Sequence, residues 1–160
     1  PTENIATLVL NGNKGDLRSL VASLNNVRPD ILHLRSSNIN DLATLLPVLS
    51  SVYTLSLGDN KISDLTPLKD VGGSATIQNI DLQFNPIQDI TPITHLSELR
   101  SINFVAIPDS AIKPLEGLKF LESLDLSAPL EGERICPYKE KENICVWSQF
   151  RFDWSAAATE

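Results

Sequence analysis

The chain has 160 residues, of which 42% are hydrophobic and 21% charged, as expected for one folded domain. Aromatic residues make up only 6%, so aliphatic side chains must build the core. The formal net charge of −7, without a cluster of lysine or arginine, argues against a nucleic-acid partner, because phosphate backbones are bound by concentrated positive charge.

A three-residue motif with apolar first and third positions recurs six times along the chain, at spacings of 22 to 25 residues. The copies are Leu8-Val9-Leu10, Leu32-His33-Leu34, Leu55-Ser56-Leu57, Ile80-Asp81-Leu82, Ile102-Asn103-Phe104 and Leu124-Asp125-Leu126. Each copy alternates apolar and outward positions, which is typical of a short strand, and the regular period is typical of a solenoid. The sequence therefore predicts six stacked parallel strands, near residues 7–11, 31–35, 54–58, 79–83, 101–105 and 123–127.

A small polar residue stands three positions after the last apolar position of the first four copies, at Asn13, Ser37, Asn60 and Asn85. The chain must bend after each strand and leaves backbone groups there without strand partners. Side chains stacked in register can form hydrogen bonds with those groups. We therefore expect a structural ladder at this position, although the fifth repeat places Ile107 there.

The segments between the strands predict helices and turns on the other side of the sheet. Residues 16–24 and 41–49 have helical periodicity, with Pro47 disturbing the second segment. The later repeats instead carry Thr66-Pro67-Leu68 and Thr91-Pro92-Ile93, and threonine followed by proline favours the start of a short helix.

Residues 131–160 are expected to form a C-terminal cap that covers the last repeat. This segment holds several large apolar side chains after the last strand, namely Ile135, Ile144, Trp147, Phe150, Phe152 and Trp154. Cys136 and Cys145 are the only cysteines, and their spacing matches neither a metal site nor a reactive C-x-x-C pair. We predict a disulfide between them that stabilises the cap.

The whole pattern resembles the internalin-like, 22-residue class of bacterial leucine-rich repeats, whose unit reads L-x-x-L-x-L-x-x-N-x-I-x-D-L-x-P-L. Residues 55–68 match this unit nearly letter for letter, and the resemblance extends over residues 5–130. It implies an α/β leucine-rich-repeat solenoid, with a curved parallel β-sheet on the concave side and helices, 3-10 turns and loops on the convex side. It also implies that the concave strand face binds a protein ligand.

The outward positions of the predicted strands and of the turns after them identify candidate contact residues. Most are small and polar, but a neighbouring group is larger or charged: Ile31, His33, Arg35, Asp59, Asp81 and Phe84. Exposed arginine and aromatic side chains often anchor protein interfaces. Two structural roles remain open, namely an ion pair between Arg35 and Asp59 and packing of Phe84 over the neighbouring turn.

The sequence predicts no enzyme, no cofactor and no metal site. His33 and His95 fall at different phases of the repeat, and no phosphate-binding loop or hydrolytic triad is evident. Asp81 and Asp125 share one outward column, two repeats or roughly 9.6 Å apart. We expect this open surface to leave both carboxyl groups without the raised pKa that general acid catalysis needs.

The predicted disulfide favours an extracellular, periplasmic or cell-surface location. The alternative is an intracellular scaffold, similar to the phosphatase-regulating leucine-rich-repeat subunits that share this repeat, and free thiols would favour it. No apolar run is long enough for membrane insertion, and a monomer is favoured over an oligomer. The chain contains no methionine and begins at Pro1, so a fragment of a larger protein also stays open.

Overall fold

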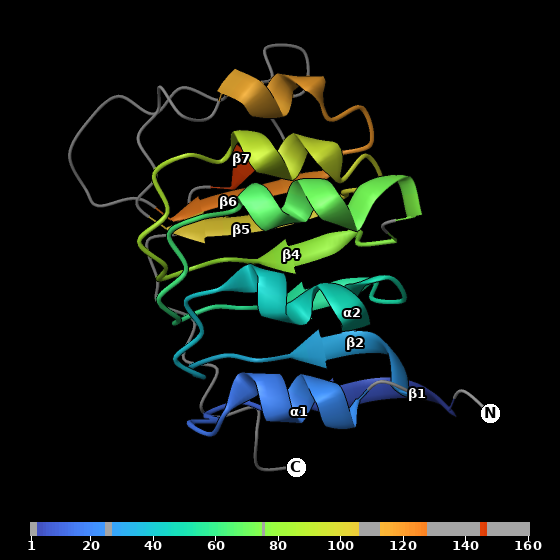
Figure 1. Ribbon diagram of the computed structural model, residues 1–160. Helices are drawn as coiled ribbons and strands as arrows, with labels where there is room; N and C mark the ends of the chain where they lie inside the picture. Colours follow the sequence, from blue (N-terminus) through green and yellow to red (C-terminus); the bar gives the residue numbers. More distant parts are fainter. Residues whose placement is uncertain (1–2, 25–26, 75, 106–112, 128–144, 147–160) are drawn as a thin grey trace.

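The protein is described by a computed structural model over residues 3–24, 27–74, 76–105, 113–127 and 145–146. Its strands form one open sheet in chain order (Figure 1). They are β1 (Glu3–Val9), β2 (Val27–His33), β3 (Thr54–Ser56), β4 (Asn79–Asp81), β5 (Ser101–Val105), β6 (Ser123–Ser127) and β7 (Cys145–Val146). All neighbouring pairs are parallel, as expected when each repeat adds one strand.

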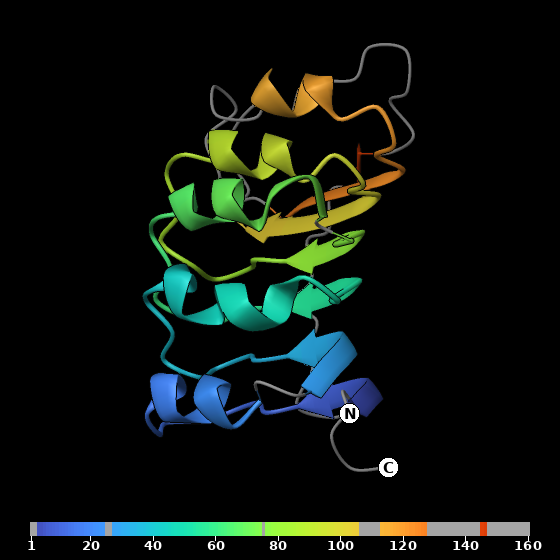
Figure 2. The same ribbon diagram turned by 45° about the vertical axis from the view of Figure 1, so that its right-hand side comes forward.

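Short helices cover one side of the sheet, and Figure 2 shows them stacked as a layer beside the strands. They are α1 (Leu17–Ser23), η1 (Leu42–Leu45), α2 (Leu46–Leu49), η2 (Thr66–Ser74), η3 (Thr91–His95) and η5 (Lys113–Gly117), where η marks a 3-10 helix. The predicted leucine-rich-repeat solenoid with strands on one side and helices on the other is confirmed.

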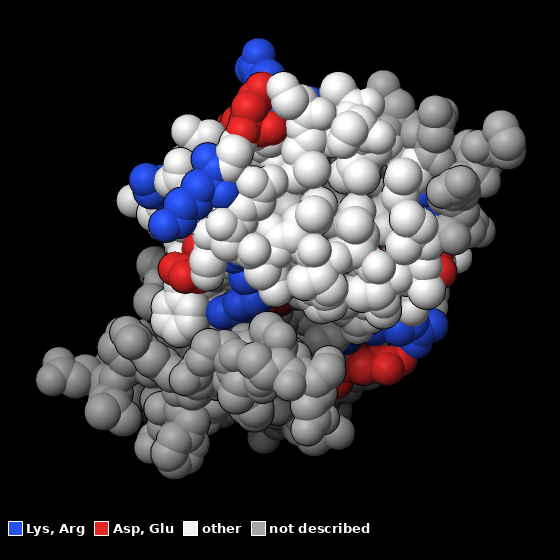
Figure 3. Space-filling view, turned by 90° about the horizontal axis from the view of Figure 1, so that it is seen from below, with Lys and Arg blue, Asp and Glu red and all other residues white. Residues whose placement is uncertain are grey.

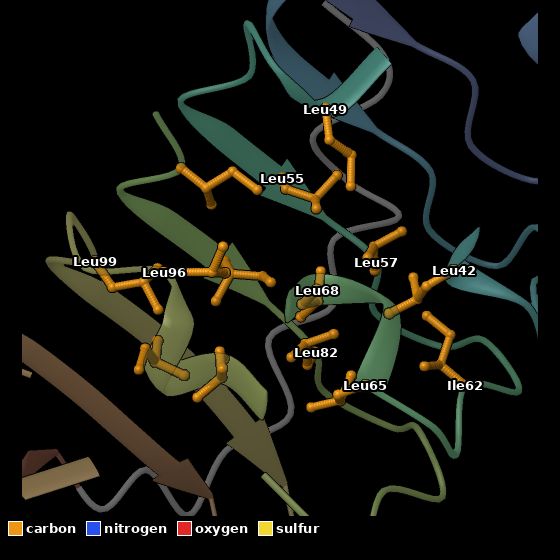
Figure 4. Close-up of a cluster of buried hydrophobic side chains, with 14 of the residues drawn as sticks. Leu42, Leu49, Leu55, Leu57, Ile62, Leu65, Leu68, Leu82, Leu96 and Leu99 are labelled. Carbon is orange, nitrogen blue, oxygen red and sulfur yellow. The ribbon is translucent and has the colours of Figure 1, made fainter. Parts of the chain in front are cut away.

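The core lies between these two layers and consists almost entirely of leucine and isoleucine (Figure 4). The strand register aligns the apolar positions of successive repeats, so that Leu32 pairs with Leu55, and Leu55 with Ile80. Their exposed fractions are 0, 0 and 2%. Burial of each such side chain contributes roughly 1.5–3 kcal/mol before chain entropy is counted, which explains the fixed apolar positions.

In each of the first four repeats, an aspartate one or two residues before the first helical residue accepts a backbone hydrogen bond. Asp16 and Asp41 accept from the N–H two residues ahead, at 3.1 and 2.9 Å, and Asp64 and Asp89 do the same in the next two repeats. A hydrogen bond from the Thr66 side chain lowers the pKa of Asp64, and one from Thr91 lowers the pKa of Asp89. The aspartate of the repeat thus satisfies an otherwise free helix N–H group.

The expected ladder of polar side chains runs through the turns after the strands, and Asn60 is its best-connected member. Its amide group makes five backbone hydrogen bonds: Nδ2 donates to the carbonyl oxygens of Leu34, Leu57 and Gly58, and Oδ1 accepts from the N–H groups of Ser37 and Ile39. Asn85 repeats this pattern one turn later, because its Nδ2 also donates to three carbonyl oxygens. One side chain therefore ties each turn to the turn before it.

Several strands differ in their bounds from the sequence expectations: β2 covers Val27–His33 where residues 31–35 were predicted, and β3 and β4 each end two residues before their predicted ends. β1 begins at Glu3, four residues before its predicted start, and its register with β2 covers the full length from Glu3 to Val9. β7 was not predicted, and it extends the sheet beyond β6. Apart from β7, the predicted cap lies outside the described residues, and so does Cys136 of the predicted Cys136–Cys145 disulfide. Within those residues, no helix has the length and apolar character needed to cross a membrane.

Candidate binding face

The strand face is the side of the sheet that points away from the helices. Its central column pairs Val9 with His33, His33 with Ser56 and Ser56 with Asp81 along four adjacent strands. Ile31 lies in the next column, paired with Thr7 of β1. The sheet thus brings Ile31, His33 and Asp81 onto one surface. This agrees with the expectation that alternate side chains along each strand point away from the core.

Arg35 and Asp81 form an ion pair across the strand face, and the pair spans the intervening repeat. Their side chains are only 13 and 12% exposed. The guanidinium group lies over Gly58, where an added Cβ atom would come within 2.8 Å of Arg35 Cζ and 3.1 Å of Asp81 Oδ2. A side chain at position 58 would therefore displace the Arg35 guanidinium group from its present place.

The sequence alternative of an Arg35–Asp59 ion pair is wrong. Asp59 is exposed and instead accepts a hydrogen bond from the Ser36 hydroxyl group at 2.7 Å. The physical reason is the missing side chain at Gly58, which opens a direct path from Arg35 to the carboxylate of Asp81.

Burial raises the pKa of Asp81, although the Gln83 N–H group and the Arg35 charge both favour the carboxylate. The expectation that this surface would leave the carboxyl groups of its outward column without a raised pKa is therefore wrong for Asp81. Gln83 is itself only 7% exposed, so this part of the strand face is better covered than an open sheet suggests.

His33 contacts the neighbouring strand through its ring. Nδ1 lies 2.9 Å from the hydroxyl oxygen of Ser56, which is 9% exposed. Burial lowers the pKa of His33; the nearby charge of Asp81 raises this pKa and that of Arg35 lowers it, but burial has the larger effect. The folded chain thus favours the neutral imidazole.

Acidification is expected to destabilise the chain through His33. The folded-state pKa lies below the ordinary value of 6.5, so below that pH the unfolded chain binds more protons at this site. The contribution of His33 to stability is present above pH 6.5 and is lost as the pH falls through the folded-state pKa. Urea unfolding at about pH 7 and about pH 5 should show a larger loss for the wild type than for His33→Gln. Equal losses in the two proteins would contradict this assignment.

Phe84 and Asp59 occupy the same position in the turns that follow their strands. Both have a left-handed backbone, with φ of 55° and 56°, and the equivalent residues Gly12 and Ser36 have φ of 70° and 54°. Glycine adopts this conformation freely, but it is rare for a bulky residue such as phenylalanine. The position of Phe84 is therefore fixed by the left-handed backbone of the turn and by the partial burial of its side chain.

Sequence reasoning missed two contributors to this surface. Val9 is 56% exposed and pairs with His33, which makes it the most exposed large apolar residue of the described strand face. Its β-branched apolar side chain in an outward column was the available signal. Gly58 was the second, because a glycine between Arg35 and Asp81 leaves room for their contact.

The arrangement of His33, Ser56 and Asp81 differs from that of a hydrolytic triad. In a triad the acid orients the histidine from the side opposite the nucleophile. Here Ser56 stands between the histidine and the aspartate in the column, and Asp81 binds Arg35 and Gln83 instead. Among the described residues, no group of three or more acidic, histidine or cysteine side chains could hold a metal ion.

Two hollows open between the first two repeats and away from the strand face. The larger, of about 430 Å³, lies between α1 and η1 and is lined by Arg18, Val21, Ala22, Asp41, Ala43, Thr44 and Pro47. The smaller, of about 250 Å³, adjoins it at the turns that hold Lys14 and Asn38. Neither includes a residue of the predicted contact set.

Solved structures of internalins match this fold. An internalin (inlF) from Listeria monocytogenes aligns with a TM-score of 0.63 and 24% sequence identity, over 80% of this chain and 36% of that protein. Internalin C2 (inlC2) from the same organism aligns with a TM-score of 0.69 and 26% identity, over 90% of this chain and 62% of that protein. The chain therefore spans less than two thirds of either protein. No family model and no curated protein matches its sequence.

Proposed function

We propose that this internalin-like leucine-rich-repeat chain is a binding module that holds a protein ligand against its strand face. The observation that carries the proposal is the surface formed by Val9, Ile31 and His33, with the Arg35–Asp81 pair beside it. Apolar and aromatic side chains next to a fixed charged pair are typical of interface centres. The rigid core beneath them keeps the surface in place, which reduces the entropy lost on binding.

The predicted contact set has unequal roles in this proposal. Three residues can contact a ligand directly, because each is at least partly exposed: Ile31 and His33 are half-exposed, and Asp59 is exposed. Arg35 and Asp81 act as a pair whose charges are already matched, so they define the shape and polarity of the surface. Phe84 contributes the edge of this surface from its turn.

We propose no catalytic role and no cofactor for this chain. The order of Ser56 and Asp81 around His33 does not support a hydrolytic mechanism, and the raised pKa of Asp81 has a structural cause in its burial. A protein-binding role needs neither a reacting group nor a closed pocket.

The binding proposal is tested by capture with matched variants of the whole chain. Four immobilised chains are compared: the wild type, Ile31→Ala, His33→Ala and Lys69→Ala. Quantitative mass spectrometry measures the amount of each protein that each chain retains. Lys69 is exposed on η2, on the opposite side of the sheet, and serves as the control. We expect both strand-face variants to reduce retention of the same protein by about tenfold, as substitution of an interface anchor does, and Lys69→Ala to retain it fully. Equal retention by all four chains would place the interface elsewhere.

We further propose a bacterial, extracytoplasmic location with a Cys136–Cys145 disulfide, and a monomeric state. The likeness to internalins and the absence of other cysteines support this location. Two free thiols in protein taken from its native compartment would favour the intracellular scaffold instead.

A further inference from the structure

A single groove lies between the first and second repeats, away from the strand face. The two hollows, of about 430 and 250 Å³, share the lining residues Arg18, Asp41 and Thr44, so together they form this helix-side groove. Both of its walls belong to described repeats, because one is formed by α1 and the turn before it and the other by η1 and the turn before it. The larger hollow alone has the volume of a small-molecule site, which is usually about 300–1,000 Å³.

The polar end of the helix-side groove lies at a gap in the ladder of turn side chains. Asn60 reaches back to the N–H group of Ile39 in the repeat before it. Ser37, in the equivalent place one repeat earlier, has a shorter side chain, and the N–H group of Gly15 instead donates to Asn13 Oδ1 within its own turn, at 2.8 Å. The turns of the first two repeats are therefore not joined at Gly15, and the hollow of about 250 Å³ opens beside it.

The other end of the helix-side groove is lined mainly by small apolar residues. Ala22 of α1 and Ala43 of η1 are exposed on its two walls, and Pro47 is exposed beside them. Val21 also lines this end and is only 5% exposed. The short side chains on both helices leave the space of about 430 Å³ between them, and an apolar chain that entered this space would shield these residues from water.

The positively charged groups of the helix-side groove are the ones that lack a partner. The carboxylates of Asp16 and Asp41 already accept hydrogen bonds from backbone N–H groups of α1 and η1. Among the described residues, by contrast, the side chains of Lys14 and Arg18 form no ion pair and no hydrogen bond. Basic side chains project at the margin of this end of the molecule (Figure 3). The charge that would complete the groove is therefore negative.

We propose that the helix-side groove binds a small carboxylate that carries a short apolar chain. Arg18 lines both ends of the groove, and the parallel N–H groups of its guanidinium group match a carboxylate. The chain of the ligand lies over Val21, between the two alanines. A doubly charged phosphate fits less well, because Asp16 and Asp41 add two negative charges to the same lining. The site does not rest on the binding proposed for the strand face.

The test uses octanoate as the probe and the whole, isotope-labelled chain, followed by NMR spectra of its amide groups. We expect saturable shifts at residues 14–22 and 37–47, with a dissociation constant in the millimolar range because the probe is small. Octanamide has the same chain without the charge and should bind at least about tenfold more weakly.

Two substitutions at exposed positions of α1 test the two ends of the groove separately. Arg18→Gln removes the positive charge and should weaken octanoate binding at least about tenfold while leaving octanamide binding unchanged. Ala22→Leu places a larger side chain in the apolar end and should weaken the binding of both probes. Lys69→Gln removes an exposed charge of η2 outside the groove and should bind octanoate as the wild type does.

The amide spectrum of each variant without probe shows that it is folded, which we expect because both positions on α1 are exposed. The proposal is overturned if octanoate causes no saturable shifts at the groove residues, or if octanamide binds the wild type as tightly. It is also overturned if Arg18→Gln binds octanoate as tightly as Lys69→Gln does, or if Ala22→Leu binds both probes as the wild type does.

Discussion

Asn60→Ala is expected to lower the free energy of unfolding by about 3–4 kcal/mol, more than any other substitution in the turns of the described repeats. The side chain makes five hydrogen bonds to the backbone and is 8% exposed. Alanine leaves the N–H groups of Ser37 and Ile39 without that acceptor, and each buried unsatisfied group costs about 1–3 kcal/mol. Chemical denaturation monitored by circular dichroism measures the loss.

Two variants make the Asn60 result specific. Asn40 is exposed and lies in a nearby turn, so Asn40→Ala should change stability by less than about 0.5 kcal/mol. Asn60→Asp keeps the acceptor oxygen but loses the donor, and we expect it also to be destabilising, because three carbonyl oxygens then face a carboxylate. A loss no larger for Asn60→Ala than for Asn40→Ala would show that the ladder is not a source of stability.

Phe104→Ala is expected to destabilise the chain by about 3–5 kcal/mol. Phe104 is 1% exposed and heads the largest fully buried side chains of the core. It occupies the position of Leu126 in the next repeat, with which it pairs in the sheet. Removal of the ring loses its burial and leaves a cavity that neighbouring repeats cannot fill without moving. Thermal unfolding and urea unfolding should both report the change.

The matched controls for Phe104 separate cavity formation from loss of an aromatic ring. Phe104→Leu restores the residue type of the other repeats and should cost less than half as much as alanine, because most of the volume is kept. Phe120 is 50% exposed, so Phe120→Ala should have little effect on stability. Comparable losses for Phe104→Ala and Phe120→Ala would contradict the placement of the core.

The repeat could be predicted from the sequence because each of its positions has one structural role, such as burial in the core or hydrogen bonding in the turn. The paired apolar positions, such as Leu55 and Leu57, are fully buried as their alternation requires. Asn60 lies where the chain turns and satisfies backbone groups there. Such local rules recur in most copies, so a short pattern is enough to predict the solenoid.

The candidate site was harder to predict because its contacts join different repeats. The Arg35 guanidinium group lies over Gly58, which has no side chain, and contacts Asp81 two repeats away. The pattern within one repeat carries no information on a contact between repeats. The left-handed backbone at Phe84 was missed for a related reason. Gly12 shows the requirement at the equivalent position, but the residues there otherwise share no chemical property.

The Arg35–Asp81 ion pair also affects the order in which the repeats unfold. Each unit of a solenoid normally interacts with its immediate neighbours alone, so the array can fray from either end one unit at a time. The Arg35–Asp81 ion pair joins the second repeat to the fourth, across the third repeat. Unfolding of any one of these three repeats therefore destabilises the other two. These three units should therefore exchange their amide hydrogens as one cooperative block, while the first unit opens before them.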